Sequence, residues 1–213
     1  MKSHPVTIVI LFLFFISSAV AQELKPIHLP PPQKEIGMPL MQALNLRQSS
    51  RDFAAKPLPL QEISNLLWAA DGINRPESGK RTAPSAMNWQ EMDLYVALPE
   101  GVFLYDPASN DLNPVVAGDV RSALGTQSFV ATAPLDLAYV ADYARVTRGS
   151  DEDKTLYTAA DAGFIAENVY LYCASQGLAA VVRGSVDRAL LAKTLKLRPD
   201  QKIILTQTVG YGK

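Results

Sequence analysis

The chain has 213 residues, of which 48% are apolar and 19% are charged, and its formal net charge is −1. This balance is typical of a globular protein with one sizeable core, and it excludes the disordered and fibrous classes. A net charge near zero gives no general attraction to nucleic acid or to an anionic membrane, so any anion site has to be local.

The first 21 residues have the layout of a secretory signal peptide. Lys2 gives a weakly positive start, residues 6–16 are almost wholly apolar, and small residues end at Ala21. The apolar run is shorter than the ~20 residues that a spanning helix needs, which favours cleavage after Ala21 over an uncleaved anchor. We therefore expect an exported protein, periplasmic or secreted, without a stable membrane anchor, that begins with an extended, proline-rich lead over residues 22–36.

The rest of the chain, residues 37–213, is predicted to form one domain with helices and strands mixed in irregular order. Apolar residues at helical spacing predict helices over 37–46, 60–70, 155–176 and 187–195. Short apolar runs predict strands over 93–98, 102–105, 115–116, 135–140, 179–182 and 202–209. Turn formers fill 107–113, and a polar loop is expected over 73–90. The mixture favours an α+β sheet with helices on its faces.

The longest predicted helix, over residues 155–176, is apolar nearly all round. Such a helix is usually buried on several sides. We therefore expect it in the middle of the domain or at a dimer interface.

Cysteine and histidine are too scarce for several kinds of active site. Cys173 is the only cysteine, and the two histidines, His4 and His28, precede the predicted domain. This argues against a disulfide, a zinc cluster, a Ser-His-Asp hydrolase and a Cys-His protease, and no metal site is predicted. An enzyme of this composition is expected to depend on a bound organic cofactor.

The first candidate binding segment follows the first predicted helix. Two guanidinium groups and two hydroxyls lie within the five residues from Arg47 to Arg51, which suits a phosphate clamp. Taken alone, this pattern is more often a solvated helix end.

Two further segments are weaker candidates. Residues 79–90 contain small residues and a proline, and Asn88 and Gln90 each offer a donor and an acceptor for a flat heterocycle. The alternative is a loop with local side-chain caps. Residues 177–185 include Gly184, which would allow close approach of a ring, although a simple strand end is the more probable interpretation of this piece alone.

In their order and combination, these segments resemble the nitroreductase family, and most closely its branch of azoline and thiazoline dehydrogenases. R-Q-S-S-R-D-F at 47–53 is similar to the family's phosphate-binding motif. L-L-W-A-A-D-G-I-N-R at 66–75 and G-K-R-T-A-P-S-A at 79–86 resemble the dehydrogenase branch, whereas M-N-W-Q at 87–90 is closer to plain nitroreductases. The stretch 125–134, Asp161-Ala162-Gly163 with Asn168, and V-G-Y-G-K at 209–213 complete a resemblance that covers residues 38–213.

The resemblance implies an α+β fold with a central, mostly antiparallel sheet flanked by helices, and a homodimer with FMN in two clefts at the dimer interface. It places Arg47, Ser49 and Arg51 at the phosphate and ribityl end, with Lys213 within reach of the phosphate. It places Pro84, Ser85 and Asn88 of the other subunit along the isoalloxazine ring. It also implies that Thr126 or Gln127 meets the polar edge of the ring, and that Arg183 and Gly184 present backbone groups near its reactive nitrogen.

Three departures from the family pattern bear on these assignments. Related nitroreductases often have an acidic residue where Arg183 stands, so its contact is expected through the backbone or with altered specificity. The dehydrogenase branch usually has Gly-Leu-Tyr-Pro at 87–90. The closing motif lacks its usual proline, and the basic residues that typically follow it are absent after Lys213.

The implied activity is that of a flavoprotein oxidoreductase. Electrons would pass between a reduced donor, nicotinamide or quinol or a partner redox protein, and a flat conjugated acceptor such as a nitroaromatic, a quinone or an azoline-like heterocycle. No catalytic side chain is assigned, because the flavin carries the reaction. The alternative is a non-catalytic module that binds flavin or another small molecule without turnover.

Overall fold

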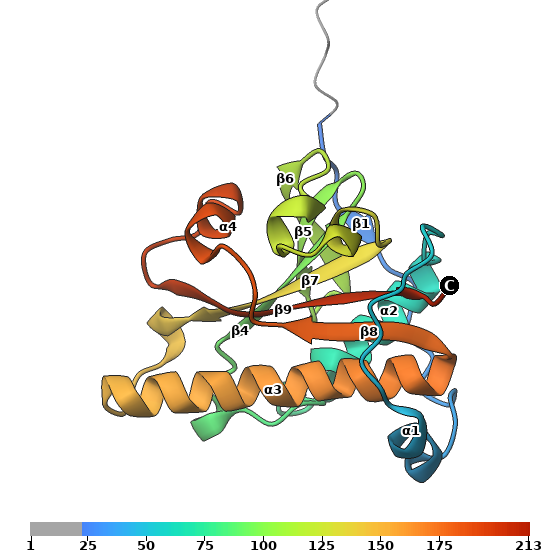
Figure 1. The fold of residues 1–213 in the computed structure, drawn as a ribbon. Coiled ribbons are helices and arrows are strands. Elements are labelled where there is room, and N and C mark those ends of the chain that lie inside the picture. Colours follow the sequence, from blue (N-terminus) through green and yellow to red (C-terminus); the bar gives the residue numbers. More distant parts are fainter. Residues whose placement is uncertain (1–22) are drawn as a thin grey trace, which may run out of the picture.

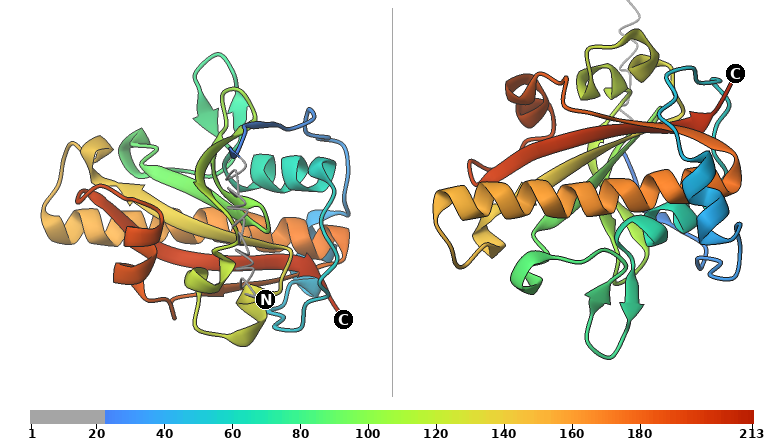
Figure 2. Two further views of the ribbon diagram at one scale, coloured as in Figure 1. Left: turned by 90° about the horizontal axis from the view of Figure 1, so that it is seen from above. Right: turned by 60° about the horizontal axis from the view of Figure 1, so that its bottom comes forward.

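The computed structural model describes residues 23–213, and its centre is a seven-stranded sheet in the order β1-β6-β5-β4-β7-β9-β8 (Figure 1). All pairs of neighbouring strands in this sheet are antiparallel. The strands are β1 (Ile27–His28), β4 (Met92–Leu98), β5 (Gly101–Asp106), β6 (Asp111–Ala117), β7 (Leu135–Asp142), β8 (Leu178–Arg183) and β9 (Gln201–Tyr211). A separate hairpin of β2 (Ile73–Arg75) and β3 (Lys80–Arg81) projects from the body (Figure 2).

Helices cover both faces of the sheet. One face carries α1 (Leu40–Leu46), α2 (Leu60–Asp71) and the long α3 (Asp151–Gln176) (Figure 1). The other face carries α4 (Arg188–Thr194) and two 3₁₀ turns, Arg121–Leu124 and Ser128–Ala131. Alternate side chains of β4 therefore enter two different cores: Leu94 and Val96 pack with α2 and α3, and Tyr95 and Ala97 pack with α4. Central β7 is buried along residues 135–141 because both of its faces are covered.

The α+β fold and its antiparallel sheet confirm the prediction, with differences at element boundaries. The helix α3 begins at Asp151, four residues before the predicted start. Ser150 and Asp153 form a capping box there, in which the Ser150 hydroxyl accepts from the Asp153 backbone N–H at 3.1 Å. The turn predicted over 107–113 was partly wrong, because β6 already begins at Asp111 and pairs with β5.

The long helix differs most from expectation. One face, which includes Ala162, Ile165 and Val169, is buried, whereas Leu156 and Phe164 are 63% and 48% exposed. The single chain therefore does not place this helix in the middle of the domain, and the expected alternative, a dimer interface, stays a prediction.

The proline-rich lead is extended, as predicted, but it packs on the domain. Its strand β1 pairs with β6, and the Pro30 carbonyl accepts from the Ser64 hydroxyl at 2.5 Å and from the Asn110 amide at 3.0 Å. The predicted signal peptide lies outside the described residues. Between residues 23 and 213, no helix combines the length and apolar character that crossing a bilayer requires.

Candidate functional site

The outer edge of β8 is the feature around which the predicted binding residues gather. β8 is the last strand of the sheet, so only β9 pairs with it. The Ser50 backbone N–H donates to the Ala180 carbonyl at 2.9 Å, and the Val182 backbone N–H donates to the Tyr170 hydroxyl at 2.7 Å. The Tyr170 hydroxyl also lies 2.9 Å from the Ser49 hydroxyl. Tyr170 thus joins α3, β8 and the 47–51 segment.

Gly184 lies just beyond the end of β8, next to this edge. In an antiparallel strand, backbone groups point alternately toward one neighbour and the other. Ala180 and Val182 direct theirs away from β9, and Gly184 follows just beyond the end of β8. The Gly184 carbonyl accepts from the Val186 backbone N–H at 3.1 Å and from the Arg188 guanidinium at 3.3 Å, so it is already paired within the chain.

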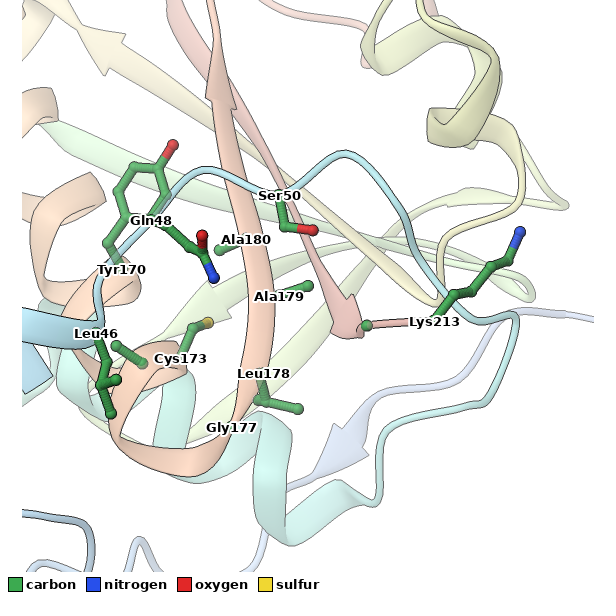
Figure 3. Close-up of a pocket in the computed structure, with 12 residues that line it drawn as sticks. Leu46, Gln48, Ser50, Tyr170, Cys173, Gly177, Leu178, Ala179, Ala180 and Lys213 are labelled. Carbon is green, nitrogen blue, oxygen red and sulfur yellow. The ribbon is translucent and has the colours of Figure 1, made fainter.

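A cavity of about 360 Å³ opens at the beginning of β8. Its walls include Gln48 and Ser50 from the 47–51 segment, Tyr170 from α3, and Lys213 at the chain end (Figure 3). Small residues, namely Gly177, Ala179, Ala180 and Gly212, form much of the rest and leave the space open. The cavity is therefore lined by polar side chains at its rim and by small residues along β8.

Cationic side chains surround this end of β8. The Arg47 guanidinium lies 5.4 Å from the centre of the Tyr170 ring, and the Lys213 ammonium lies 3.7 Å from an Asp52 carboxylate oxygen. Arg51 is exposed between Ser50 and Asp52. The C-terminus is held here by the Phe53–Gly212 bridge. Of the predicted phosphate residues, Lys213 lines the cavity, Arg47 and Ser49 contact Tyr170, and Arg51 is exposed in the same segment.

At the other end of β8, the Arg183 side chain is buried beneath the edge. Its guanidinium lies 3.1 Å from the Asp136 carboxylate, and the Thr208 hydroxyl bonds to both groups. Burial raises the pKa of the Asp136 carboxyl, while Thr208 and Arg183 oppose that rise. Because the side chain of Arg183 is committed to the interior, only its backbone is available to a ligand.

Thr126 and Gln127 lie beside this end. The Thr126 and Ser185 hydroxyls are 2.9 Å apart, and the Thr126 backbone N–H donates to the Ser185 carbonyl at 3.4 Å. The Gln127 amide oxygen is buried without a protein partner, and it would lie 3.2 Å from a Cβ added at Gly125. The Arg183 Nε, a buried donor that is also unpaired, lies 3.0 Å from the same position, so the unpaired acceptor and the unpaired donor both lie beside Gly125.

Pro84, Ser85 and Asn88 lie elsewhere in the same chain. The backbone N–H of Ala86 donates to Asp161 on α3 at 2.8 Å. Asp161 is nine residues before Tyr170, or about 13 Å along a helix. One chain therefore does not bring residues 84–88 together with the cluster at the edge of β8.

Sequence reasoning did not assign roles to Gln48, Ser50, Tyr170 and Asp136. Gln48 and Ser50 lie inside the basic and hydroxyl motif at 47–51, and only this motif indicated that they could belong to a site. Tyr170 is one of several aromatic residues in an apolar helix, and Asp136 is the single charge inside a buried strand. Their roles depend on contacts between distant segments.

Comparisons with known proteins identify similar chains. The model of the nitroreductase family matches residues 44–211. A protein of Methanocaldococcus jannaschii, named as a candidate nitroreductase, is 31% identical over 180 residues, covering 77% of this chain and 90% of that protein. A crystal structure of a candidate nitroreductase from Ralstonia eutropha is 48% identical, covers 92% of this chain and 93% of that one, and has a TM-score of 0.86.

A more distant structure shares the fold. The NADPH:FMN oxidoreductase of Vibrio harveyi in complex with NAD⁺ is 19% identical, with a TM-score of 0.63 over 82% of this chain and 69% of that one.

The buried ion pair generates the first prediction. At pH 8, Asp136→Asn should lower the free energy of unfolding by about 3 kcal/mol, because the Arg183 guanidinium loses its buried counter-charge. In urea unfolding, the double variant Asp136→Asn with Arg183→Met should lose less than the sum of the two single variants. Asp119→Asn, whose carboxylate is 44% exposed beside Arg121, serves as the control and should cost less than about 1 kcal/mol. Strict additivity of the two core substitutions would contradict the assignment.

Proposed function

The chain belongs to the nitroreductase family, and from this membership we propose that it is an FMN-dependent oxidoreductase that passes electrons between a reduced donor and a flat, conjugated acceptor. The family makes the chain a flavin-type oxidoreductase in general terms. The observation that carries the specific proposal is the arrangement along β8, with cations and hydroxyls at its beginning and the buried Arg183 side chain beneath its end. Placement in the azoline and thiazoline dehydrogenase branch stays a prediction.

The residues at the beginning of β8 fit the phosphate and ribityl end of FMN. Arg47 and Arg51 offer planar guanidinium groups that can bind a phosphate with two parallel hydrogen bonds, and Lys213 adds a point charge. The Tyr170 hydroxyl orients that of Ser49. The cavity of about 360 Å³ supplies space beside them.

The residues at the end of β8 fit the ring. We assign the polar edge of the isoalloxazine to Thr126 or Gln127, and the reactive nitrogen to the backbone of Arg183 and Gly184. Bound FMN supplies the electron transfer, and the residues of the chain hold and orient the ring and its substrate.

Substrates would be flat molecules that stack on the ring, such as nitroaromatics, quinones or azoline-like heterocycles. The donor would be a nicotinamide or, for an exported protein, a quinol or a redox protein. Anaerobic mixing of the flavoprotein with NADPH or with a reduced quinone separates these donors. A protein that binds flavin but accepts electrons from none of them would instead fit the alternative, a binding module without turnover.

The phosphate clamp provides the second prediction. Arg47→Ala should weaken FMN binding about 10- to 100-fold, because a charge-assisted hydrogen bond contributes roughly 1.5–3 kcal/mol. Titration of the apoprotein with FMN, followed by flavin absorbance and fluorescence, measures the change. Arg47→Lys should be intermediate because it keeps the charge and loses the planar fork. Arg148→Ala, an exposed arginine outside this site, is the control. Wild-type apoprotein that binds no FMN would refute the proposed function.

We also propose that the protein is a homodimer joined through α1 and α3. Large apolar side chains are exposed on these two adjacent helices: Leu40, Met41, Leu44 and Leu46 on α1, and Leu156 and Phe164 on α3. An exposed apolar surface of this kind is typical of an interface. Ser85 and Asn88 lie away from the β8 edge of their own chain, so a second copy would have to supply them to the ring.

Phe164→Glu tests the dimer. A carboxylate placed in an apolar interface loses its hydration without gaining a partner, so this variant should sediment as a monomer at concentrations where the wild type is a dimer. Its flavin affinity should also fall. Leu190→Glu is the matched control, because Leu190 is 52% exposed on α4, on the opposite face of the sheet. A dimer of unchanged strength in Phe164→Glu would contradict the proposed interface.

Export is proposed from the amino-terminal pattern of residues 1–21. Leu24, three residues after the expected cleavage point, packs against the core. Mass spectrometry of the protein isolated from its natural host should identify Gln22 as the first residue. A mature chain that keeps Met1 would exclude cleavage.

A further inference from the structure

The segment from Ser85 to Gln90 has an unusual backbone. Met87, Asn88 and Gln90 have positive φ values of 51°, 55° and 48°. Residues with a Cβ are strained in this region, and such conformations persist only where surrounding contacts determine them. A specific set of contacts must therefore hold this segment.

Two buried carboxyl groups make those contacts. Asp161 on α3 accepts a hydrogen bond from the Ala86 backbone N–H at 2.8 Å. Glu91 accepts one from the Ser85 hydroxyl at 3.3 Å, and that hydroxyl in turn accepts from the Gln90 backbone N–H at 2.8 Å. Glu91 is fully buried and Asp161 is 2% exposed. The two carboxyl groups thus fix both ends of the strained segment.

The two carboxyl groups bind adjacent residues, Ser85 and Ala86, and both line one small cavity. The second oxygen of Glu91 is buried and has no hydrogen-bond partner. Two buried carboxylates this close repel strongly when both are ionised, so one of them keeps a proton. That proton can bridge the pair.

No neighbouring cation neutralises this pair. The charged side chains packed around it are Asp71, Arg81, Asp93 and Arg145. Arg81 pairs with Asp71 at 3.0 Å, and Arg145 pairs with Asp93 at 2.6 Å. Arg145 touches Glu91 only at its backbone carbonyl, at 2.8 Å. The proton is therefore the remaining means of relieving the repulsion.

We propose that Glu91 and Asp161 are positioning residues that share one proton, and that the protonated pair holds residues 85–90 in the conformation that presents Ser85 and Asn88. The hydrogen bonds of the two carboxyl groups to Ser85 and Ala86 support the conformational role. Its consequence for the flavin ring of a second copy rests on the proposed function. Loss of the shared proton releases the segment.

The direction of the pH dependence follows from the burial of Glu91. Burial, together with the neighbouring Asp161, raises the pKa of Glu91 from an ordinary value of 4.5 to about 7. The folded state therefore binds this proton more tightly than the unfolded state. Its stabilising contribution is complete below about pH 4.5 and is lost as the pH rises through about 7. The segment should be held at pH 6 and loosened at pH 8.5.

Trp89 reports on this change without any flavin. It lies within the segment, is 8% exposed, and packs edge-on against Tyr157 with ring centres 6.0 Å apart. In a Trp68→Phe background, the fluorescence of Trp89 in the apoprotein should shift to longer wavelength with a midpoint near pH 7. Hydrogen exchange of the Ala86 and Gln90 amides should accelerate over the same range beyond the intrinsic tenfold per pH unit.

Glu91→Gln removes the ionisation at nearly constant shape, so it should abolish both transitions. Asp161→Asn removes the like charge and should abolish them too, which gives a second variant if the first folds poorly. Asp71→Asn is the control: Asp71 also has a pKa raised by burial to about 7, but it does not contact Ser85 or Ala86. Because the charge of Asp71 repels that of Glu91, the transitions should remain in this variant with a lower midpoint. Fluorescence and exchange that are independent of pH, or transitions lost only in Asp71→Asn, would overturn the proposal.

Flavin binding tests the consequence separately. The wild type should bind FMN about tenfold more weakly at pH 8.5 than at pH 6, whereas Glu91→Gln should bind equally at both. If the apoprotein bound no FMN at any pH, the proposed function would fail while the fluorescence result stood. A normal FMN affinity without the Trp89 transition would refute the inference and leave the proposed function intact.

Discussion

β8 ends the sheet, so the backbone groups along its outer side have no neighbouring strand to pair with. The unpaired backbone groups of such an edge can pair with a strand of another chain unless other parts of the protein cover them. In this chain Ser50 and Tyr170 take up two of the outward groups, those of Ala180 and Val182. Beyond them, the Gly184 carbonyl accepts from Val186 and Arg188. The binding residues are arranged relative to this edge, because the 47–51 segment, α3 and the C-terminus are all fastened to β8 or β9.

The two ends of the edge differ in their electrostatics. At the beginning of β8 the cations are exposed or half-buried, where a charged phosphate can keep part of its hydration. At its end, Arg183 and Asp136 form a buried pair that satisfies charge inside the protein and leaves the surface above it to backbone and small polar groups. This asymmetry matches a ligand with an anionic tail and a flat neutral ring. It also explains why an arginine is tolerated at this point, since its charge is used internally.

The sequence predicted best those features that repeat locally. The helix α3 and the strand β7 have long apolar patterns, and both were found. The strands β1, β2 and β3 have two or three residues each and exist because of partners elsewhere in the chain, so no local pattern marks them. For the site, the resemblance placed Arg47 and Lys213 near one phosphate although they stand at opposite ends of the domain. The buried pair of Arg183 and Asp136 was not predicted, because a charge within an apolar run shows neither its partner nor its depth.

In the proposed dimer, a single chain contains only part of the site. The residues expected along the flavin ring, Ser85 and Asn88, are held against the middle of α3, while the edge of β8 lies near its C-terminal half. The same helix leaves the large apolar side chain of Phe164 uncovered between these positions. Packing two copies along α1 and α3 would cover that surface and bring residues 85–90 of one copy toward the β8 edge of the other. The carboxyl pair that fixes residues 85–90 then lies beneath the interface, so the stability of the interface and the geometry of the cleft would depend on the same buried proton.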